Sequence, residues 1–284
     1  MSASVDLSPY GTYRPEPFLR MVLALTHSLP ANWLGFRAST PFRRLAIDRL
    51  DTRPVDTELW GARMRLHPHD NSCEKNALFT PQWFDRRERE VLAAAIEQRV
   101  RAGATFTFVD VGANVGLYSL FVASRGGAHA RVLAVEPQRE LVARMAFSLQ
   151  CNPGFNVAVV QAAAADRDGE MDLVVYRPDR AGSSVKRHAA AFAGAEIVPV
   201  PCRPLAAMVA EAGITAIDAL KIDVEGAEDL VLPPFLREAP QDLLPRLLMI
   251  EDRPDWNVDL YALLQERRYV VAMRTQHNVV FRLA

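Results

Sequence analysis

The chain has 284 residues and a mass of 31.6 kDa, enough for one α/β domain with an extension. Half of its residues are hydrophobic and 24% are charged, which excludes a disordered or collagen-like protein. The net charge is -1 and the pI is about 6.6, whereas proteins that hold nucleic acid usually carry a dense basic face. We therefore expect a packed globular protein without a nucleic-acid partner.

The cysteines and the N-terminal region indicate in which cellular compartment we expect the protein. Cys73, Cys151 and Cys202 lie far apart and form no Cys-x-x-Cys pair, so neither a disulfide framework nor a zinc site is indicated. The first residues lack the basic and then apolar order of a secretory signal. Charged and polar residues interrupt the apolar stretch 18–34, which falls short of the roughly 20 apolar residues of a membrane span. We expect a cytoplasmic protein with no membrane span and a helix over Phe18–Ser28.

The chain changes character near residue 85. Residues 1–84 contain many Pro, Trp and Arg residues and only short apolar runs, among them a strand pattern over 59–66 that is typical of a hairpin. After residue 85 the pattern becomes regular. The sequence therefore predicts an N-terminal helical and hairpin extension over residues 1–84, which covers the substrate side, and a cofactor-binding domain over residues 85–284.

Helical and strand patterns alternate in the second part. They predict a helix over 85–101, a strand over 106–111, a helix over 117–124, a strand over 131–135 and a helix over 139–150. Later strands are predicted at 157–162, 171–176, 219–222, 247–250, 269–273 and 279–282. This alternation indicates an α/β fold with a Rossmann-like, doubly wound, mostly parallel sheet. The last two strands are close together in the sequence, so we expect an antiparallel pair at the sheet edge.

The loop after the strand at 106–111 occupies the place where open α/β sheets bind ligands. It contains Asp110, Gly112, Asn114 and Gly116, and its glycines let the backbone approach a ligand closely. The helix that follows offers free N–H groups. Glu136 ends the next strand, where its carboxylate can accept hydrogen bonds from both hydroxyls of a ribose. Loop and acid together predict a site for an adenosine-containing ligand.

The residues of this loop narrow the choice of ligand. A dinucleotide fingerprint needs glycines where the chain has Asn114 and Leu117, and a P-loop needs a lysine after a glycine, which the chain lacks. The remaining pattern is typical of Rossmann-type methyltransferases that use S-adenosylmethionine. We therefore predict this cofactor, with Asp110 near the cationic end of its methionine part and Glu136 on its ribose. Radical chemistry would need a tight run of three cysteines, which is absent.

A second acidic group follows the strand at 219–222. Asp223 ends this strand beside the cofactor loop and is our candidate catalytic residue, with Glu225 as the second. An ordinary Asp has a pKa of about 3.9, whereas a sugar hydroxyl has a pKa of roughly 15.7, so Asp223 can accept the proton only while the O–C bond forms. Lys221 is expected to be an ion-pair partner.

Two alternatives for these acids stay open. In the first, Glu225 only interacts favourably with the positive end of the following helix and has no catalytic role. In the second, Asp223, Glu225 and Glu251 together bind a divalent metal that lowers the pKa of the acceptor hydroxyl. We do not favour the metal, and no metal site is assigned.

Substrate-binding candidates come from two other places. The polar loop with Asp70, Asn71 and Glu74 could close over the substrate and bind its hydroxyls, or it could be a solvated turn capped by Asp70. Glu251 ends the strand at 247–250 on the same rim as Asp223.

Three segments in order resemble the motifs of FkbM-type methyltransferases, namely 108–119 (FVDVGANVGLYS), 135–137 (VEP) and 220–228 (LKIDVEGAE). The resemblance extends from residue 67 to the C-terminus and leaves residues 1–55 uncovered. It implies S-adenosylmethionine-dependent O-methylation of a hydroxyl on a sugar, a glycan or a polyketide-type product. The alternatives are an N-methyltransferase and a non-catalytic adenosine-binding partner module. Neither the particular acceptor nor the oligomeric state follows from the sequence.

Overall fold

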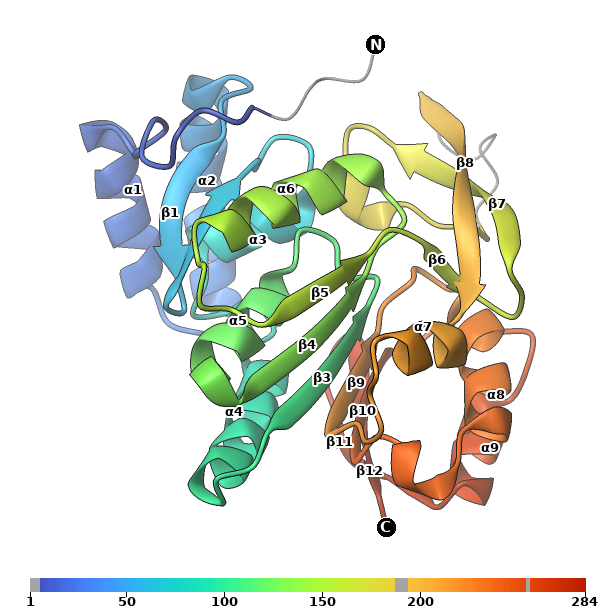
Figure 1. Ribbon diagram of the computed structural model, residues 1–284. Helices are drawn as coiled ribbons and strands as arrows, with labels where there is room; N and C mark the ends of the chain where they lie inside the picture. Colours follow the sequence, from blue (N-terminus) through green and yellow to red (C-terminus); the bar gives the residue numbers. More distant parts are fainter. Residues whose placement is uncertain (1–5, 187–193, 254–255) are drawn as a thin grey trace.

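A computed structural model describes residues 6–186, 194–253 and 256–284 (Figure 1). The N-terminal part contains α1 (Pro17–Ser28), α2 (Trp33–Leu50), β1 (Val55–Leu59), β2 (Ala62–Leu66) and α3 (Ser72–Phe79). The helix expected over 18–28 is confirmed. The single strand expected over 59–66 is wrong, because Trp60 and Gly61 have positive φ angles and turn the chain between β1 and β2. The sequence did not predict α2.

The central sheet has the strand order β11-β12-β10-β9-β3-β4-β5 in the described part of the chain. Its strands are β3 (Phe106–Val111), β4 (Ala130–Val135), β5 (Val157–Val160), β9 (Ala219–Ile222), β10 (Leu247–Glu251), β11 (Tyr269–Arg274) and β12 (Asn278–Leu283). The predicted antiparallel pairing of β11 with β12 is confirmed. β12 lies second from the edge and also pairs antiparallel with β10, whereas the other neighbours in the sheet are parallel.

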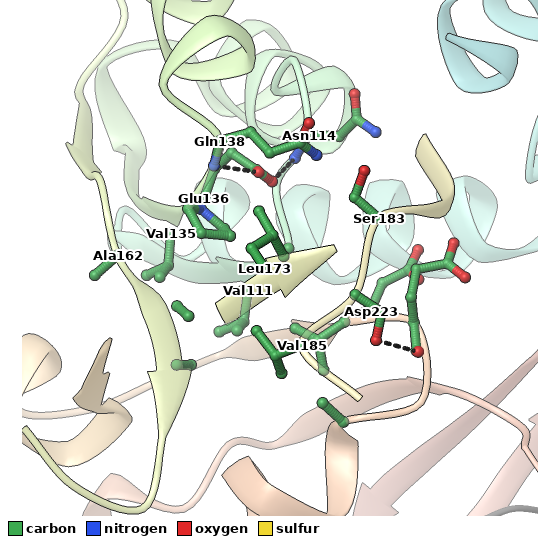
Figure 2. A pocket seen from close by; sticks show the side chains of 18 of the residues that line it. Val111, Asn114, Val135, Glu136, Gln138, Ala162, Leu173, Ser183, Val185 and Asp223 are labelled. Carbon is green, nitrogen blue, oxygen red and sulfur yellow. Dashed lines mark hydrogen bonds between the residues drawn. The ribbon is translucent and has the colours of Figure 1, made fainter. Parts of the chain in front are cut away.

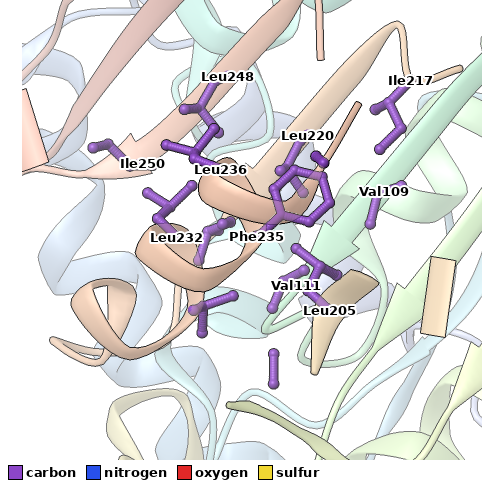
Figure 3. Close-up of a cluster of buried hydrophobic side chains, with 14 of the residues drawn as sticks. Val109, Val111, Leu205, Ile217, Leu220, Leu232, Phe235, Leu236, Leu248 and Ile250 are labelled. Atoms are coloured by element: carbon purple, nitrogen blue, oxygen red, sulfur yellow. The ribbon is translucent and has the colours of Figure 1, made fainter. Parts of the chain in front are cut away.

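Helices cover both faces of this sheet, as the alternating pattern predicted. They are α4 (Arg86–Arg101), α5 (Leu117–Gly126), α6 (Arg139–Gln150), α7 (Leu205–Glu211), α8 (Glu228–Glu238) and α9 (Leu260–Glu266), with short 3₁₀ turns at Gly127–His129, Arg180–Gly182 and Gln241–Leu243. Side chains of β3 alternate between the faces. Phe106 and Phe108 pack with α4 and α5, while Val109 and Val111 pack with α7, α8 and α9 (Figure 3). The doubly wound fold is confirmed.

A separate three-stranded sheet follows β5. It consists of β6 (Ala163–Ala165), β7 (Gly169–Tyr176) and β8 (Ala195–Pro204) in the order β6-β8-β7. The strand predicted at 171–176 is β7, so it belongs to this small sheet and not to the central one. After β7 the chain folds back along this strand, and Ser184 forms an isolated antiparallel bridge with Val174 of β7.

Across the described ranges, no helix combines the length and the apolar composition that a bilayer span requires.

Candidate active site

A cavity lies at the carboxyl ends of β3, β4 and β9, where the strand order of the central sheet reverses (Figure 2). It holds about 540 Å³ of empty space, part of it open to solvent. Five of the residues that the sequence singled out line it: Gly112, Asn114, Glu136, Asp223 and Glu225. Residues 162–164, at the start of the small sheet, and the segment 181–185 complete the wall.

Asp110 and Gly116 are not among the residues that line the cavity. Asp110 lies on the α5 face of β3, is 1% exposed and accepts a hydrogen bond from the Ser119 hydroxyl at 2.7 Å. Burial raises the pKa of Asp110, and the nearby Lys221 opposes this. Gly116 precedes α5 with a positive φ angle. The expected contact of Asp110 with the methionine part of the cofactor stays a prediction.

Two backbone N–H groups hold the Glu136 carboxylate. Gln138 N–H donates to Oε1 and Asn114 N–H donates to Oε2, each at 2.9 Å (Figure 2). Burial raises the pKa of Glu136 to about 7, although both N–H groups favour the charged form. A carboxylate oxygen has more than one acceptor site. Glu136 can therefore accept further hydrogen bonds from a ligand in the cavity.

Gln138 brings a buried acceptor to the cavity that the sequence analysis missed. Its Nε2 donates to the Arg180 carbonyl at 3.1 Å, which fixes the orientation of the amide. Its Oε1 is buried and has no hydrogen-bond partner among the described residues. Such an acceptor in a cavity wall indicates a place for a donor from a ligand. The wall that holds Glu136 thus fits an adenosine moiety, which carries hydroxyl and amino donors.

Gly112 brings the loops after β3 and β9 together. Its φ angle is +77°, and a Cβ there would lie 1.9 Å from the Asp223 carbonyl oxygen. The Asp223 N–H donates to the Val111 carbonyl at 2.9 Å. Only glycine fits this position, because any side chain would displace the backbone of the Asp223 loop.

Asp223 forms an ion pair with Lys221, as expected for this lysine. Lys221 Nζ lies 2.7 Å from Oδ2 of Asp223 and 4.8 Å from the centroid of the Tyr118 ring. Burial opposes the charge of Lys221, yet Asp223 and Asp110 raise its pKa above the ordinary value. The Asp223 side chain remains 37% exposed. The cavity therefore receives a carboxylate that has a fixed cationic neighbour and stays accessible to a ligand.

Glu225 and Glu251 join Asp223 in an acidic rim. Each of the three offers an oxygen within 4.8 Å of the others. Arg253 binds two of them, with Nη2 at 2.5 Å from Glu225 and Nε at 2.8 Å from Glu251. Side-chain cations thus hold the carboxylates that would bind a metal. No motif in the sequence marks Arg253 as part of the site.

Asp70 and Glu74 lie in a buried ion network. Arg144 of α6 binds Glu74 at 2.8 Å and Asp70 at 2.6 Å, and Arg180 binds Asp70 at 3.0 Å. Glu74 is completely buried, and neither acid is among the residues that line the cavity. The turn is not capped by Asp70, because Asn71 accepts from the Glu74 N–H and begins α3. A sequence signal for this network exists, since Arg144 lies on the buried face of α6.

Asn71 connects the extension to the cofactor loop. Its Nδ2 donates to Oδ1 of Asn114 at 2.7 Å, and the same oxygen accepts from the Val115 N–H at 2.8 Å. Asn114 has a φ angle of 54°, and its own N–H donates to Glu136. A chain of hydrogen bonds therefore runs from the start of α3 to the Glu136 carboxylate.

Comparisons with known proteins agree with this fold. A family model described as "Methyltransferase FkbM domain" matches residues 110–271. No curated protein sequence matches the chain. Similar solved structures include a methyltransferase FkbM from Methylobacillus flagellatus KT, with 18% identity and a TM-score of 0.45 over 63% of this chain and 43% of that one. This chain thus spans less than half the length of that protein.

Two further solved structures are similar to parts of this chain. A SAM dependent methyltransferase from Agrobacterium tumefaciens has 12% identity and a TM-score of 0.45, with 81% of this chain and 70% of that chain covered. A putative rRNA-methylase from Clostridium thermocellum has 10% identity and a TM-score of 0.38, with 69% and 93% covered.

Proposed function

Because the chain belongs to the FkbM methyltransferase family, we propose that it methylates a hydroxyl on a sugar, a glycan or a polyketide-type product, with S-adenosylmethionine as donor. The observation that carries this proposal is the exposed Asp223 carboxylate in the cavity wall, on a different side from Glu136 (Figure 2). One side offers acceptors for an adenosine, and the other offers a proton acceptor.

Glu136 and Gln138 would hold the cofactor. The Glu136 carboxylate would accept hydrogen bonds from the two ribose hydroxyls, and the unpartnered Oε1 of Gln138 would accept from a third donor. Gly112 lets the loop backbone approach the ligand without a side chain in between. When bound, S-adenosylmethionine supplies a methyl group on a positively charged sulfur.

Asp223 would take the proton of the acceptor hydroxyl. The hydroxyl would become more acidic as its oxygen is methylated, and the Asp223 carboxylate would accept the proton that it releases. Lys221 would keep Asp223 oriented through its bond to Oδ2. Alignment of oxygen, methyl carbon and sulfur would supply most of the rate enhancement. Glu225 and Glu251, which Arg253 holds, would bind other hydroxyls of the acceptor.

The extension over residues 1–84 would act on the substrate side of the domain over residues 85–284. A contact that supports this role is the Asp70 carbonyl, which accepts from the Arg180 N–H at 2.8 Å. Arg180 directly precedes the segment 181–185 that lines the cavity. Asp70 would thus position this wall.

The proposal is tested by incubating the protein with methyl-labelled S-adenosylmethionine and a panel of sugar alcohols, glycans and amines. We expect label on an oxygen of a hydroxyl acceptor, mapped by mass spectrometry. Label on nitrogen alone would replace the proposal with the N-methyltransferase alternative. Tight cofactor binding without transfer to any acceptor would favour a non-catalytic adenosine-binding module.

A further inference from the structure

Large apolar side chains are exposed mainly on α1 and α2. Six of the eleven exposed large hydrophobic residues in the described ranges belong to these two helices: Met21, Leu25, Trp33, Leu34, Phe42 and Leu45. Trp33 is 59% exposed and Leu34 is 57% exposed. A monomeric protein rarely leaves several large apolar groups together in water unless they contact something.

The apolar residues of α2 form two faces. Gly35 and Ala46 are buried on the face that packs against the rest of the extension. Leu34, Phe42 and Leu45 recur at helical spacing beside that buried face and stay exposed, and we call these three the outer apolar face. Figure 1 shows α1 and α2 at the outside of the molecule, on the far side from β7 and β8. The outer apolar face is therefore open to a partner.

Positive charge surrounds this face. Residues 17–50 contain five arginines and one acidic residue, Asp48, so this segment carries +4 while the whole chain carries -1. Arg37 and Arg44 lie along one side of the outer apolar face and Arg49 lies between its apolar residues, and all three arginines are exposed. Apolar groups beside arginines are typical of a helix that lies in the interface of an anionic membrane.

We infer that α1 and α2 dock the protein onto an anionic membrane surface, with the outer apolar face between the lipid headgroups and the arginines beside the phosphates. A second copy of this chain is a poorer occupant, because two such faces would bring like charges together. The inference does not depend on the proposed function, since docking requires no methyl transfer.

The test uses vesicles of phosphatidylcholine alone and vesicles with 30% phosphatidylglycerol, a composition of about the charge density of natural anionic surfaces. Full-length protein should sediment with the anionic vesicles, and raised salt should release it. The double variant Leu34→Glu, Leu45→Glu should partition at least tenfold more weakly. Ile197→Glu on β8 is the matched control, because Ile197 is as exposed as Leu45, at 54%.

Each other outcome overturns the inference. Equal sedimentation of the double variant, or none of the wild type, would remove the membrane as occupant. Light scattering that finds a wild-type dimer and a monomeric double variant would assign the outer apolar face to a second copy. Because both leucines are exposed, the double variant should fold, and an unchanged circular dichroism melt checks this.

Discussion

The two acidic walls of the cavity are held in different ways. Backbone N–H groups fix Glu136, so its position follows directly from the path of the chain after β3 and β4. Side-chain cations fix the rim, where Lys221 binds Asp223 and Arg253 binds Glu225 and Glu251. A wall held by backbone tolerates changes in the surrounding side chains, whereas the rim depends on two particular residues. We expect the first wall to serve a constant cofactor and the second to suit one acceptor.

Substitution of Asp223 should distinguish the roles of the two walls most clearly, because it should change turnover and not cofactor affinity. Asp223→Asn keeps the size of the side chain but removes the proton acceptor, so turnover should fall by about 10²–10⁴-fold. Cofactor affinity, measured by calorimetry, should stay nearly unchanged. Asp242→Asn, an exposed carboxylate replaced in the same way, is the control. Near-normal turnover of Asp223→Asn would refute the catalytic role, and loss of wild-type activity with a chelator would revive the metal alternative.

Substitution of Glu136 should have the complementary effect. Glu136→Ala removes two charge-assisted hydrogen bonds to the ribose, each worth about 1.5–3 kcal/mol, so cofactor affinity should fall at least tenfold. Calorimetry on protein freed of co-purified ligand measures this. An unchanged affinity in a folded variant would contradict the assignment of this wall to the cofactor.

The pKa of Glu136 makes cofactor binding depend on pH. Burial raises it to about 7, and the negative charges of Asp110 and Asp223 add to this. Below pH 7 the carboxyl is protonated and loses an acceptor, so affinity should fall by up to about tenfold between pH 8 and pH 6. Titrations across this range measure the effect. Glu136→Gln should bind weakly at every pH, and a slope that persists in this variant would assign the effect to another group.

The smallest expected effect tests the connection from the extension. Asn71→Ser keeps an oxygen that caps α3 but lacks the amide that donates to Asn114. Loss of one neutral hydrogen bond is worth about 0.5–1.5 kcal/mol, so cofactor affinity should fall by a few-fold. The thermal midpoint should change little, because serine is also a good cap. If affinity stays at the wild-type value, the extension does not position the cofactor loop.

The sequence predicted the parts of the site that depend on local chain direction. A strand followed by a Gly-rich turn placed Gly112 and Asn114, and the end of the next strand placed Glu136, because parallel strands end at one edge of the sheet. Contacts between distant side chains were not predictable in this way. Arg253 reaches Glu225 across 28 residues, and although a buried arginine on α6 indicates that Arg144 needs acidic partners, no local pattern says that these are the acids of the extension.

The small sheet was missed for a related reason. The strand at 171–176 has the pattern of β7, but pattern alone does not say which sheet a strand joins, and β8 lies about 20 residues further on. Helix α2 was missed because the residues that it buries, Gly35, Ser39 and Ala46, are small, while its large apolar residues Leu34, Phe42 and Leu45 are exposed, so its apolar pattern does not mark the buried face.

Because Gly112 has no side chain, the cofactor loop and the Asp223 loop can approach each other closely. The loop that would cradle the methyl donor and the loop that carries the proton acceptor touch where a single carbon atom would not fit. A methyl group at position 112 would push against the backbone of Asp223 and move the two partners of the transfer apart, although it contacts neither the carboxylate nor any other reacting atom. The spacing of donor and base thus depends on the absence of a side chain at this position, and Gly112→Ala should lower turnover although every reactive group is still present.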